Sequence, residues 1–255
     1  MARRNSVALA RDLGLALDPA GFMRELGLSP DPWQADLLST APHRALLNCC
    51  RQSGKSTTAA GLALHTALYV PGSLVLLVSP SLRQSGELFR KVGGFYHQLT
   101  GVERAVQESV LRIELANGSR VVSLPGSEGT VRGYSSASLV IADEAARISD
   151  DLMAAIRPML AVTNGRLIAM STPWGKRGWW HKEWALGGDN WKRFSLRAED
   201  CPRISKEFLA DEERALGPFL YRQEYLCEFL DDESSIFPTA LIDAALTNEI
   251  EPLWR

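Results

Sequence analysis

Residues 50–57 read Cys-Arg-Gln-Ser-Gly-Lys-Ser-Thr, and this stretch limits the folds open to the chain more than any other. An apolar run at 45–50 includes its first residue, and residues 57–69 follow with apolar side chains at helical spacing. A strand, a Gly-Lys-Ser turn and a helix in this order predict a phosphate-binding loop, because a helix N-terminus presents backbone N–H groups to an anion. The common form of this loop begins with a glycine where the chain has Cys49, so a simple helix-capping turn is the alternative.

The residues of this loop have predicted roles with a nucleoside triphosphate and Mg²⁺. Gly54 lets the backbone approach the phosphates closely, and Lys55 neutralises charge on the β- and γ-phosphates. Ser56 is a predicted Mg²⁺ ligand through its hydroxyl group. The predicted nucleotide-binding residues are Gln34, Arg51, Gln52, Ser53, Gly54, Lys55, Ser56 and Thr57.

Gln34 is included because of its place about twenty residues before the loop, in the sequence Pro32-Trp33-Gln34. A glutamine amide donates and accepts hydrogen bonds at once, as the edge of adenine also does. We therefore expect ATP rather than GTP as the nucleotide. The alternative is that Gln34 only begins a surface helix.

A second motif, Leu-Val-Ile-Ala-Asp-Glu at 139–144, is an apolar strand that ends in two carboxylates. Asp143 is the predicted second Mg²⁺ ligand, and Glu144 is the predicted general base that activates the attacking water. A solvated strand end is the alternative for this motif alone. Another apolar run, at 167–170, leads into Ser171 and Thr172, which we predict to couple nucleotide state to movement; a plain turn is the alternative there.

The order of apolar runs predicts the fold class. Runs at 45–50, 74–78, 139–142 and 167–170 alternate with helical segments, which indicates an α/β fold with a mainly parallel sheet. Residues 110–115 and 120–124 flank Asn117-Gly118, so a β-hairpin insertion is expected between them. We predict a core over 1–196, with 1–30 as an N-terminal helical extension, a smaller unit over 197–235, and a linker over 236–255.

Composition excludes several classes of protein. The longest apolar runs are too short to cross a bilayer, and no apolar stretch with a cleavage site follows Arg3 and Arg4, so neither a membrane protein nor a signal peptide is predicted. The four cysteines show no zinc-binding spacing and fit a reducing compartment. A formal net charge of −2 gives no general sign of nucleic-acid binding.

Taken together, these motifs resemble the large terminase subunits of tailed bacteriophages. The resemblance rests on Trp33-Gln34, the loop at 51–56, Ala-Asp-Glu-Ala-Ala at 142–146, Ser-Thr-Pro at 171–173 and Gln-Glu-Tyr-Leu-Cys-Glu-Phe at 223–229. It implies an ASCE/RecA-like P-loop NTPase core, with 197–235 as a lid subdomain. It also implies an ATPase motor that moves double-stranded DNA through a portal into a procapsid. Family members carry a C-terminal nuclease, and we expect none in this chain.

The resemblance further implies an arginine finger, and two residues are candidates. Arg132 lies in a glycine-flanked loop before the second motif and would reach a neighbouring subunit; this is the favoured assignment. Arg51, in the phosphate loop, would act within its own subunit. Such fingers are worth about 10³–10⁵ in rate.

A local basic window offers the only sequence sign of DNA contact. Residues 174–197 hold six basic and two acidic residues and five tryptophans. Cations are needed to grip the phosphates of a duplex, so the candidate DNA contacts are Lys176, Arg177, Lys192 and Arg193. Tryptophans at 179, 180 and 184 equally suit a helix packed on the sheet, and that alternative is slightly favoured.

The resemblance also sets expectations for partners and place. Expected partners are double-stranded DNA, a portal protein, a small terminase subunit and further copies in a homo-oligomeric ring, with five as the family expectation and a monomer in isolation. The expected location is the cytoplasm of an infected bacterial host, transiently on the procapsid portal. Two alternatives stay open: a helicase-like DNA translocase, and a nucleotide-dependent portal-docking module with little activity of its own. Room for a second RecA-like domain is lacking for the first, and Glu144 argues against the second.

Overall fold

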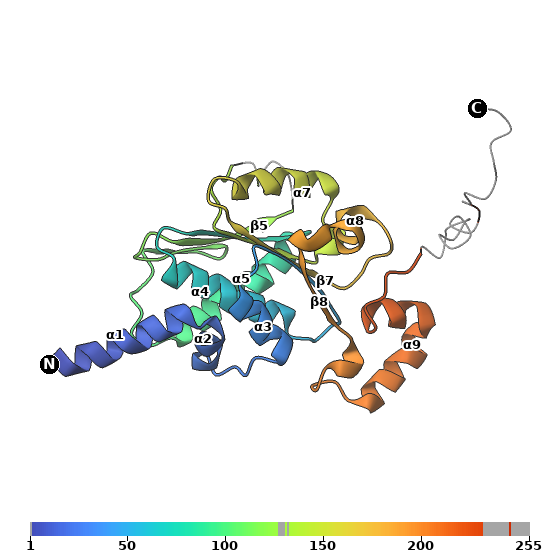
Figure 1. Cartoon of the computed structure of the whole chain (residues 1–255), viewed down its shortest axis with the longest axis horizontal. Helices are drawn as coiled ribbons and strands as arrows, with labels where there is room; N and C mark the ends of the chain where they lie inside the picture. Colours follow the sequence, from blue (N-terminus) through green and yellow to red (C-terminus); the bar gives the residue numbers. More distant parts are fainter. Residues whose placement is uncertain (1, 127–130, 132, 232–244, 246–255) are drawn as a thin grey trace.

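The computed structural model describes residues 2–126, 131, 133–231 and 245, and their core is a twisted sheet with helices on both faces (Figure 1). The described strands pair in the order β3-β4-β5-β2-β6-β7-β1-β8. Their bounds are β1 (Arg44–Cys49), β2 (Leu74–Ser79), β3 (Gln107–Glu108), β4 (Arg112–Glu114), β5 (Arg120–Pro125), β6 (Leu139–Asp143), β7 (Arg166–Ser171) and β8 (Lys192–Leu196).

The sheet is mainly parallel, as predicted. Strands β5, β2, β6, β7, β1 and β8 all pair in parallel, and β3 and β4 are the antiparallel strands among those described. The Asn117-Gly118 turn does form a hairpin, between β4 and β5. However, β5 also pairs along its whole length with β2, so the second strand of the hairpin belongs to the parallel core and is not part of an insertion.

Helices cover the two faces of the sheet unequally. In Figure 1, α2 to α5 lie on one side of the sheet, and α7 and α8 lie on the other. The described α-helices are α1 (Ala2–Leu17), α2 (Pro19–Glu25), α3 (Pro32–Thr40), α4 (Lys55–Tyr69), α5 (Leu82–Gln98), α7 (Asp150–Ile156), α8 (Gly178–Leu186) and α9 (Lys206–Glu224). None of them is long and apolar enough to span a membrane.

The central strands are continuous apolar runs because both of their faces are buried. Along β1, Leu47 belongs to the core beneath α2 to α5, whereas its neighbour Leu46 belongs to the core beneath α7 and α8. Alternate residues of β2 divide in the same way, with Leu77 and Leu76 on opposite faces. Burial on both sides thus gives the central strands β2, β6, β7 and β1 their sequence signature, and their parallel pairing places their carboxyl ends at the same edge of the sheet.

Residues 197–231 form a small helical unit at the carboxyl end of the sheet, which we call the α9 unit (Figure 1). Helix α9 is broken at Gly217, where φ is 74°, just before Pro218. The unit has its own apolar cluster, which includes Leu209, Tyr221 and Tyr225, and this cluster contacts Cys50 of the phosphate loop. The predicted lid over 197–235 falls mainly on this unit. The predicted linker over 236–255 lies outside the described residues except for position 245.

Candidate nucleotide-phosphate site

The predicted phosphate loop connects the end of β1 to the start of α4. Gly54 is the residue before α4 and adopts φ 88°, and Gln52 adopts φ 60°, so the loop bends through two left-handed residues. A Cβ atom at position 54 would also lie 2.7 Å from Gln34 Nε2, so the end of that side chain would have to shift. The loop therefore presents the N-terminus of a fifteen-residue helix at the carboxyl edge of the sheet.

The Lys55 ammonium group and the Ser53 hydroxyl group belong to the loop that leads into this helix N-terminus. Lys55 Nζ donates to the carbonyl oxygens of Cys49 and Cys50, at 2.7 and 2.8 Å. The Ser53 hydroxyl group is buried and has no hydrogen-bond partner among the described residues. A buried unpaired hydroxyl is costly, and beside inward-facing amides it fits a polar ligand such as a phosphate oxygen.

Gln34 is brought to this loop from a distant segment. Its side chain is buried and lies against Gly54, and its Oε1 accepts a hydrogen bond from Asp31 N at 2.8 Å. Gln34 does stand at the start of a helix, α3, as the alternative expected, but its side chain is buried and forms a capping box with Asp31. Adenine recognition by Gln34 stays a prediction.

The two acidic residues of the second motif end up in different settings. Asp143 ends β6 and accepts a hydrogen bond from Glu144 N at 3.0 Å. Burial, aided by the Glu144 charge, raises the pKa of Asp143 to about 6, although Lys55 opposes the shift. Glu144 adopts φ 51° and lies 3.7 Å from Arg147 Nε. Asp143 is therefore partly withdrawn from solvent, and its role as a Mg²⁺ ligand stays a prediction.

Ser56 and Asp143 are chemically suited to hold Mg²⁺. Hydroxyl and carboxylate oxygens are the ligands this ion prefers, and it commonly uses one or two carboxylates together with substrate phosphates. The described residues contain no cluster of three or more His, Cys, Asp or Glu side chains able to hold a metal by themselves. The donor set therefore fits a metal that is shared with a phosphate ligand.

Strand β7 lies between β1 and β6 in the sheet, so the Ser171-Thr172 pair is placed between the two motifs. The Ser171 hydroxyl is buried and has no partner within the described ranges. Thr172 Oγ1 donates to Glu224 Oε2 at 3.2 Å, and Arg51 Nε donates to the same oxygen at 2.8 Å. Thr172 and the phosphate loop therefore contact the same carboxylate at the end of α9, and the coupling role of Ser171 and Thr172 stays a prediction.

Two residues that the sequence analysis did not single out also touch the loop. Glu224 is one, and its membership of the 223–229 motif was the available signal. Arg203 is the other: its Nη1 and Nη2 bind the Asp31 carboxylate at 2.9 and 2.7 Å, and Nη2 also donates to Ser53 O at 2.9 Å. Arg203 stands between Pro202 and Ile204 and belongs to none of the motifs, so the sequence gives no sign of this contact.

The candidate fingers and DNA contacts are only partly described. Arg132 lies outside the described residues, so its role stays a prediction. The basic window contains an edge strand, β8, that the sequence analysis did not predict. On it, Lys192 binds Asp36 and Thr40, and Arg193 donates to carbonyl oxygens at the end of α8.

The other two candidate DNA contacts lie before α8. Lys176 Nζ is 3.3 Å from Asp231 Oδ2, and the Arg177 guanidinium lies 5.2 Å from the centroid of the Trp174 ring. Trp179 and Trp180 of α8 are buried in the core beneath α7 and α8, and Trp184 is partly buried against it, which confirms the packing alternative for the helix; Trp191, outside the helix, is buried in the same core. Contact of the four cations with DNA stays a prediction.

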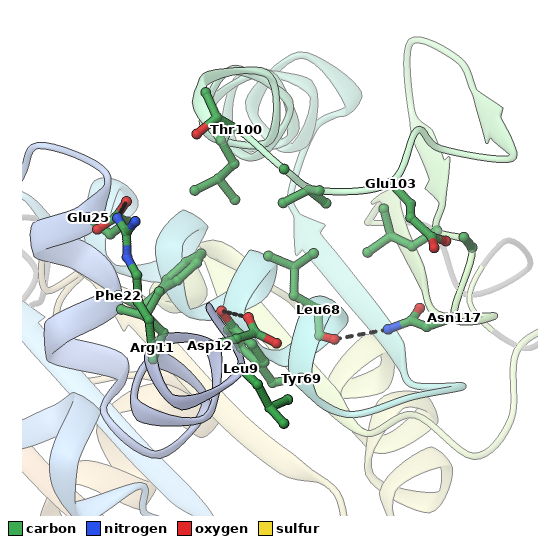
Figure 2. Close-up of a pocket in the computed structure, with 16 residues that line it drawn as sticks. Leu9, Arg11, Asp12, Phe22, Glu25, Leu68, Tyr69, Thr100, Glu103 and Asn117 are labelled. Atoms are coloured by element: carbon green, nitrogen blue, oxygen red, sulfur yellow. Dashed lines mark hydrogen bonds and ion pairs between the residues drawn. The ribbon is translucent and has the colours of Figure 1, made fainter. Parts of the chain in front are cut away.

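Two cavities flank different parts of the molecule. One of about 420 Å³ adjoins the phosphate loop and is lined by Gln52, Arg203, Ile204, Ser205 and Phe208. The other, of about 800 Å³, lies between the N-terminal helices, the end of α4 and the loop after α5 (Figure 2). None of the predicted site residues lines it, and its Arg11 is paired with Glu25. The smaller cavity is therefore the one associated with the candidate site.

Comparison with known families and proteins gives one consistent result. The family described as "Terminase large subunit, T4likevirus-type, N-terminal" matches residues 46–244. The terminase large subunit of Escherichia phage T5 is 31% identical over 242 residues, covering 88% of this chain and 53% of that protein. That of Thermus phage G20c is 26% identical over 252 residues, covering 85% and 52%. The chain spans about half the length of these curated relatives.

Solved structures resemble the fold as well. The large terminase ATPase domain of Thermus phage P74-26 superposes with a TM-score of 0.71 at 23% identity, over 82% of this chain and 98% of that one. The large terminase of another thermophilic bacteriophage, in complex with ATP-gamma-S, superposes with a TM-score of 0.60 at 13% identity, over 84% and 52%. At these identities the likeness concerns the fold, which agrees with the predicted RecA-like α/β class.

Proposed function

Because this chain belongs to the terminase large subunit family, through its T4likevirus-type N-terminal region, we propose that it binds Mg-ATP and hydrolyses it to drive double-stranded DNA into a procapsid. The observation that carries the proposal is the meeting of two motifs at one sheet edge. The phosphate loop follows β1 and the Asp143-Glu144 pair ends β6, with β7 between them. Structures of a thermophilic bacteriophage's large terminase with ADP and with ATP-gamma-S support a nucleotide as the ligand of this fold.

The loop residues bind the substrate in this proposal. Backbone N–H groups at the start of α4 and the Lys55 ammonium group hold the β- and γ-phosphates. Lys55 must then exchange its two carbonyl partners in the loop for phosphate oxygens. Ser56 and Asp143 hold Mg²⁺, which when bound neutralises charge that develops on the phosphate oxygens.

Glu144 acts on the nucleophile. Its carboxylate orients a water molecule and takes a proton from it as the water oxygen bonds to the γ-phosphorus. The bond from that phosphorus to the bridging oxygen breaks at the same time, so the products are ADP and phosphate. An arginine stabilises the transferred group. We assign this role to Arg132 of a neighbouring subunit, with Arg51 of the same subunit as the alternative.

The partners follow from the proposed motor. They are double-stranded DNA, a portal protein, a small terminase subunit and other copies of this chain in a ring, in the cytoplasm of an infected bacterial host. The candidate DNA contacts are Lys176, Arg177, Lys192 and Arg193. Lys176 pairs with Asp231, Lys192 binds α3, and Arg193 donates to carbonyl oxygens at the end of α8, so these three would have to exchange partners to bind phosphates.

The test is nucleotide binding and hydrolysis by the wild-type chain, two site variants and one control variant. Glu144→Gln keeps the size of the side chain but removes the base, so we expect ATP binding to persist and hydrolysis to fall by about 10²–10⁴-fold. Lys55→Ala should lose both. Lys182→Ala, a surface change in α8, is the control and should keep both. A wild-type chain that neither binds nor hydrolyses ATP would overturn the proposal.

A further inference from the structure

Glu224 holds an unusual position for a carboxylate. It is the last residue of α9, where the helix dipole disfavours an anion, and only 8% of the residue is exposed. Burying a carboxylate is costly unless donors satisfy it. Its donors are Arg51 and Thr172, which both bind Oε2. Two unfavourable features of one side chain are thus offset by groups from the candidate phosphate site.

The contact also determines how Arg51 is held. Glu224 binds Arg51 through Nε, and the two terminal nitrogens of that guanidinium make no hydrogen bond to any described residue. A guanidinium is planar and rigid, so fixing Nε fixes the direction of the terminal fork. The Arg51 side chain is 62% exposed and also feels the negative charge of Glu144, so the fork is in the vicinity of the general base.

We propose that Glu224 is a positioning residue that holds Arg51 ready to bind the terminal phosphate of the nucleotide. This inference rests on the proposed ATPase function and adds a residue to it. Arg51 would then favour a triphosphate over a diphosphate, because ADP lacks the group it contacts. Since Thr172 shares the same oxygen, a change at the terminal phosphate would reach both the end of β7 and the α9 unit.

A purely structural role is the rival explanation. The α9 unit has other ties to the sheet and loop: Asn48 Nδ2 donates to Cys227 O at 2.9 Å, and Arg203 donates to Ser53 O. If Glu224 only made one more contact of this kind, losing it would loosen the α9 unit and lower the affinity for all nucleotides equally. Positioning of Arg51 instead predicts a loss that is selective for the triphosphate.

The experiment compares ATP-gamma-S and ADP affinities by calorimetry in wild type, Glu224→Ala, Arg51→Ala and the double variant. We expect Glu224→Ala to lower the affinity for ATP-gamma-S about tenfold, because one charge-assisted contact is lost. The affinity for ADP should fall by less than about twofold. The double variant should be no worse than Arg51→Ala, because both changes remove the same contact. Glu224→Gln should retain most of the affinity, since its amide oxygen still accepts from both donors.

Two further variants complete the design. Glu228→Ala is the matched control, because Glu228 lies four residues on and pairs with Arg222 instead; both affinities should stay unchanged. Arg51→Lys keeps the charge but lacks Nε, so it should lose the triphosphate preference as Arg51→Ala does. It carries the test if Glu224→Ala does not fold.

Three outcomes would overturn the inference. They are an equal loss of ATP-gamma-S and ADP affinity in Glu224→Ala, additive losses in the double variant, and a wild-type preference for triphosphate in Arg51→Lys. A wild-type chain that binds neither nucleotide would overturn the proposed ATPase function itself. Wild-type binding with a non-selective Glu224→Ala loss would overturn only the role of Glu224.

Discussion

Arg203 binds both carboxylate oxygens of Asp31, at 2.9 and 2.7 Å, and so ties the α9 unit to the residue that caps α3. The same guanidinium donates to the carbonyl oxygen of Ser53 in the phosphate loop. Three segments distant in sequence are therefore joined by one side chain. The arrangement lies beside Gln34, because Asp31 and Gln34 share the capping box.

The first prediction concerns this ion pair. Arg203→Ala should lower the free energy of unfolding by roughly 0.5–1 kcal/mol, a modest amount because 45% of the arginine side chain is exposed. Asp31→Asn with Arg203→Ala should then show coupling in a double-mutant cycle measured by urea unfolding. Arg214→Ala, which breaks an exposed pair within α9, is the control and should change stability less. Additive losses would contradict the shared contact.

The second prediction concerns Gly54, which combines a left-handed φ with a close neighbour. Gly54→Ala should destabilise the fold by roughly 1–3 kcal/mol and abolish nucleotide binding, because the added Cβ meets Gln34 and alters the loop. Gly72 is a matched control: its φ is 70°, but a Cβ there meets nothing within 4 Å. Gly72→Ala should lower the free energy of unfolding by roughly 1 kcal/mol, from backbone strain alone, and leave the nucleotide affinity unchanged. Equal effects of the two substitutions would contradict the close approach.

The third prediction concerns pH. Burial lowers the pKa of His65, whose Nε2 lies 3.0 Å from Leu15 O and whose ring packs on Phe22. The hydrogen bond to Leu15 O opposes this shift of the pKa, as does the charge of Asp18, whereas the charge of Arg166 adds to it. An unfolded histidine has a pKa of about 6.5, so below that pH the unfolded chain binds a proton that the folded chain excludes. Stability should therefore be unaffected by His65 above about pH 6.5 and fall as the pH drops toward the folded pKa.

The measurement is the unfolding free energy of wild type and His65→Gln at several pH values from 8 to 5. A glutamine amide can still donate to Leu15 O but does not titrate there, so its stability should fall less steeply on acidification. Any packing loss is read at pH 8, where both side chains are neutral. Burial also lowers the pKa of His181 and raises the pKa of Asp143 to about 6, and these two shifts act with opposite signs on acidification; both are common to wild type and variant, so only the difference between the two slopes reports on His65. Identical slopes would contradict the shift at His65.

Much of the fold was predictable because burial on both faces leaves a mark in the sequence. Leu46 and Leu47 face opposite cores, so β1 is apolar at nearly every position and stands out. β8 was missed because it is an edge strand with mixed exposure, in a window whose tryptophans and cations draw attention to other functions. The break of α9 at Gly217 was signalled by Gly-Pro, but continuation of the helix beyond it was not.

The candidate site was predictable to the extent that it lies in continuous motifs. Lys55 and Ser56 follow from one local turn, and Asp143 follows from one strand end. The contact between Arg51 and Glu224 spans 173 residues, and only the folded chain brings the two together. Likewise, the sequence around Arg203 does not predict its contact with Asp31. Long-range polar contacts therefore have to be seen in the structure, whereas the candidate phosphate-binding residues are predicted from local motifs.

The last prediction tests whether Arg132 acts on a neighbouring subunit. A finger that acts between subunits makes hydrolysis depend on association, so the specific activity should rise steeply with protein concentration. Activity that is robust and independent of concentration would favour Arg51 as the finger within one subunit. Arg132→Ala should lower the rate by about 10³-fold or more, the range of arginine fingers.

Mixing inactive variants separates the two assignments most sharply. Arg132→Ala has a complete base, and Glu144→Gln has a complete finger, so a mixed assembly contains interfaces where each supplies what the other lacks. We expect a mixture of the two to hydrolyse ATP faster than either alone. Lys55→Ala with Glu144→Gln is the control, because both substitutions disable the site of their own subunit and no interface is restored. If the first mixture is as inactive as the second while both variants still associate, Arg132 does not act in trans, and Arg51 takes the role of the finger.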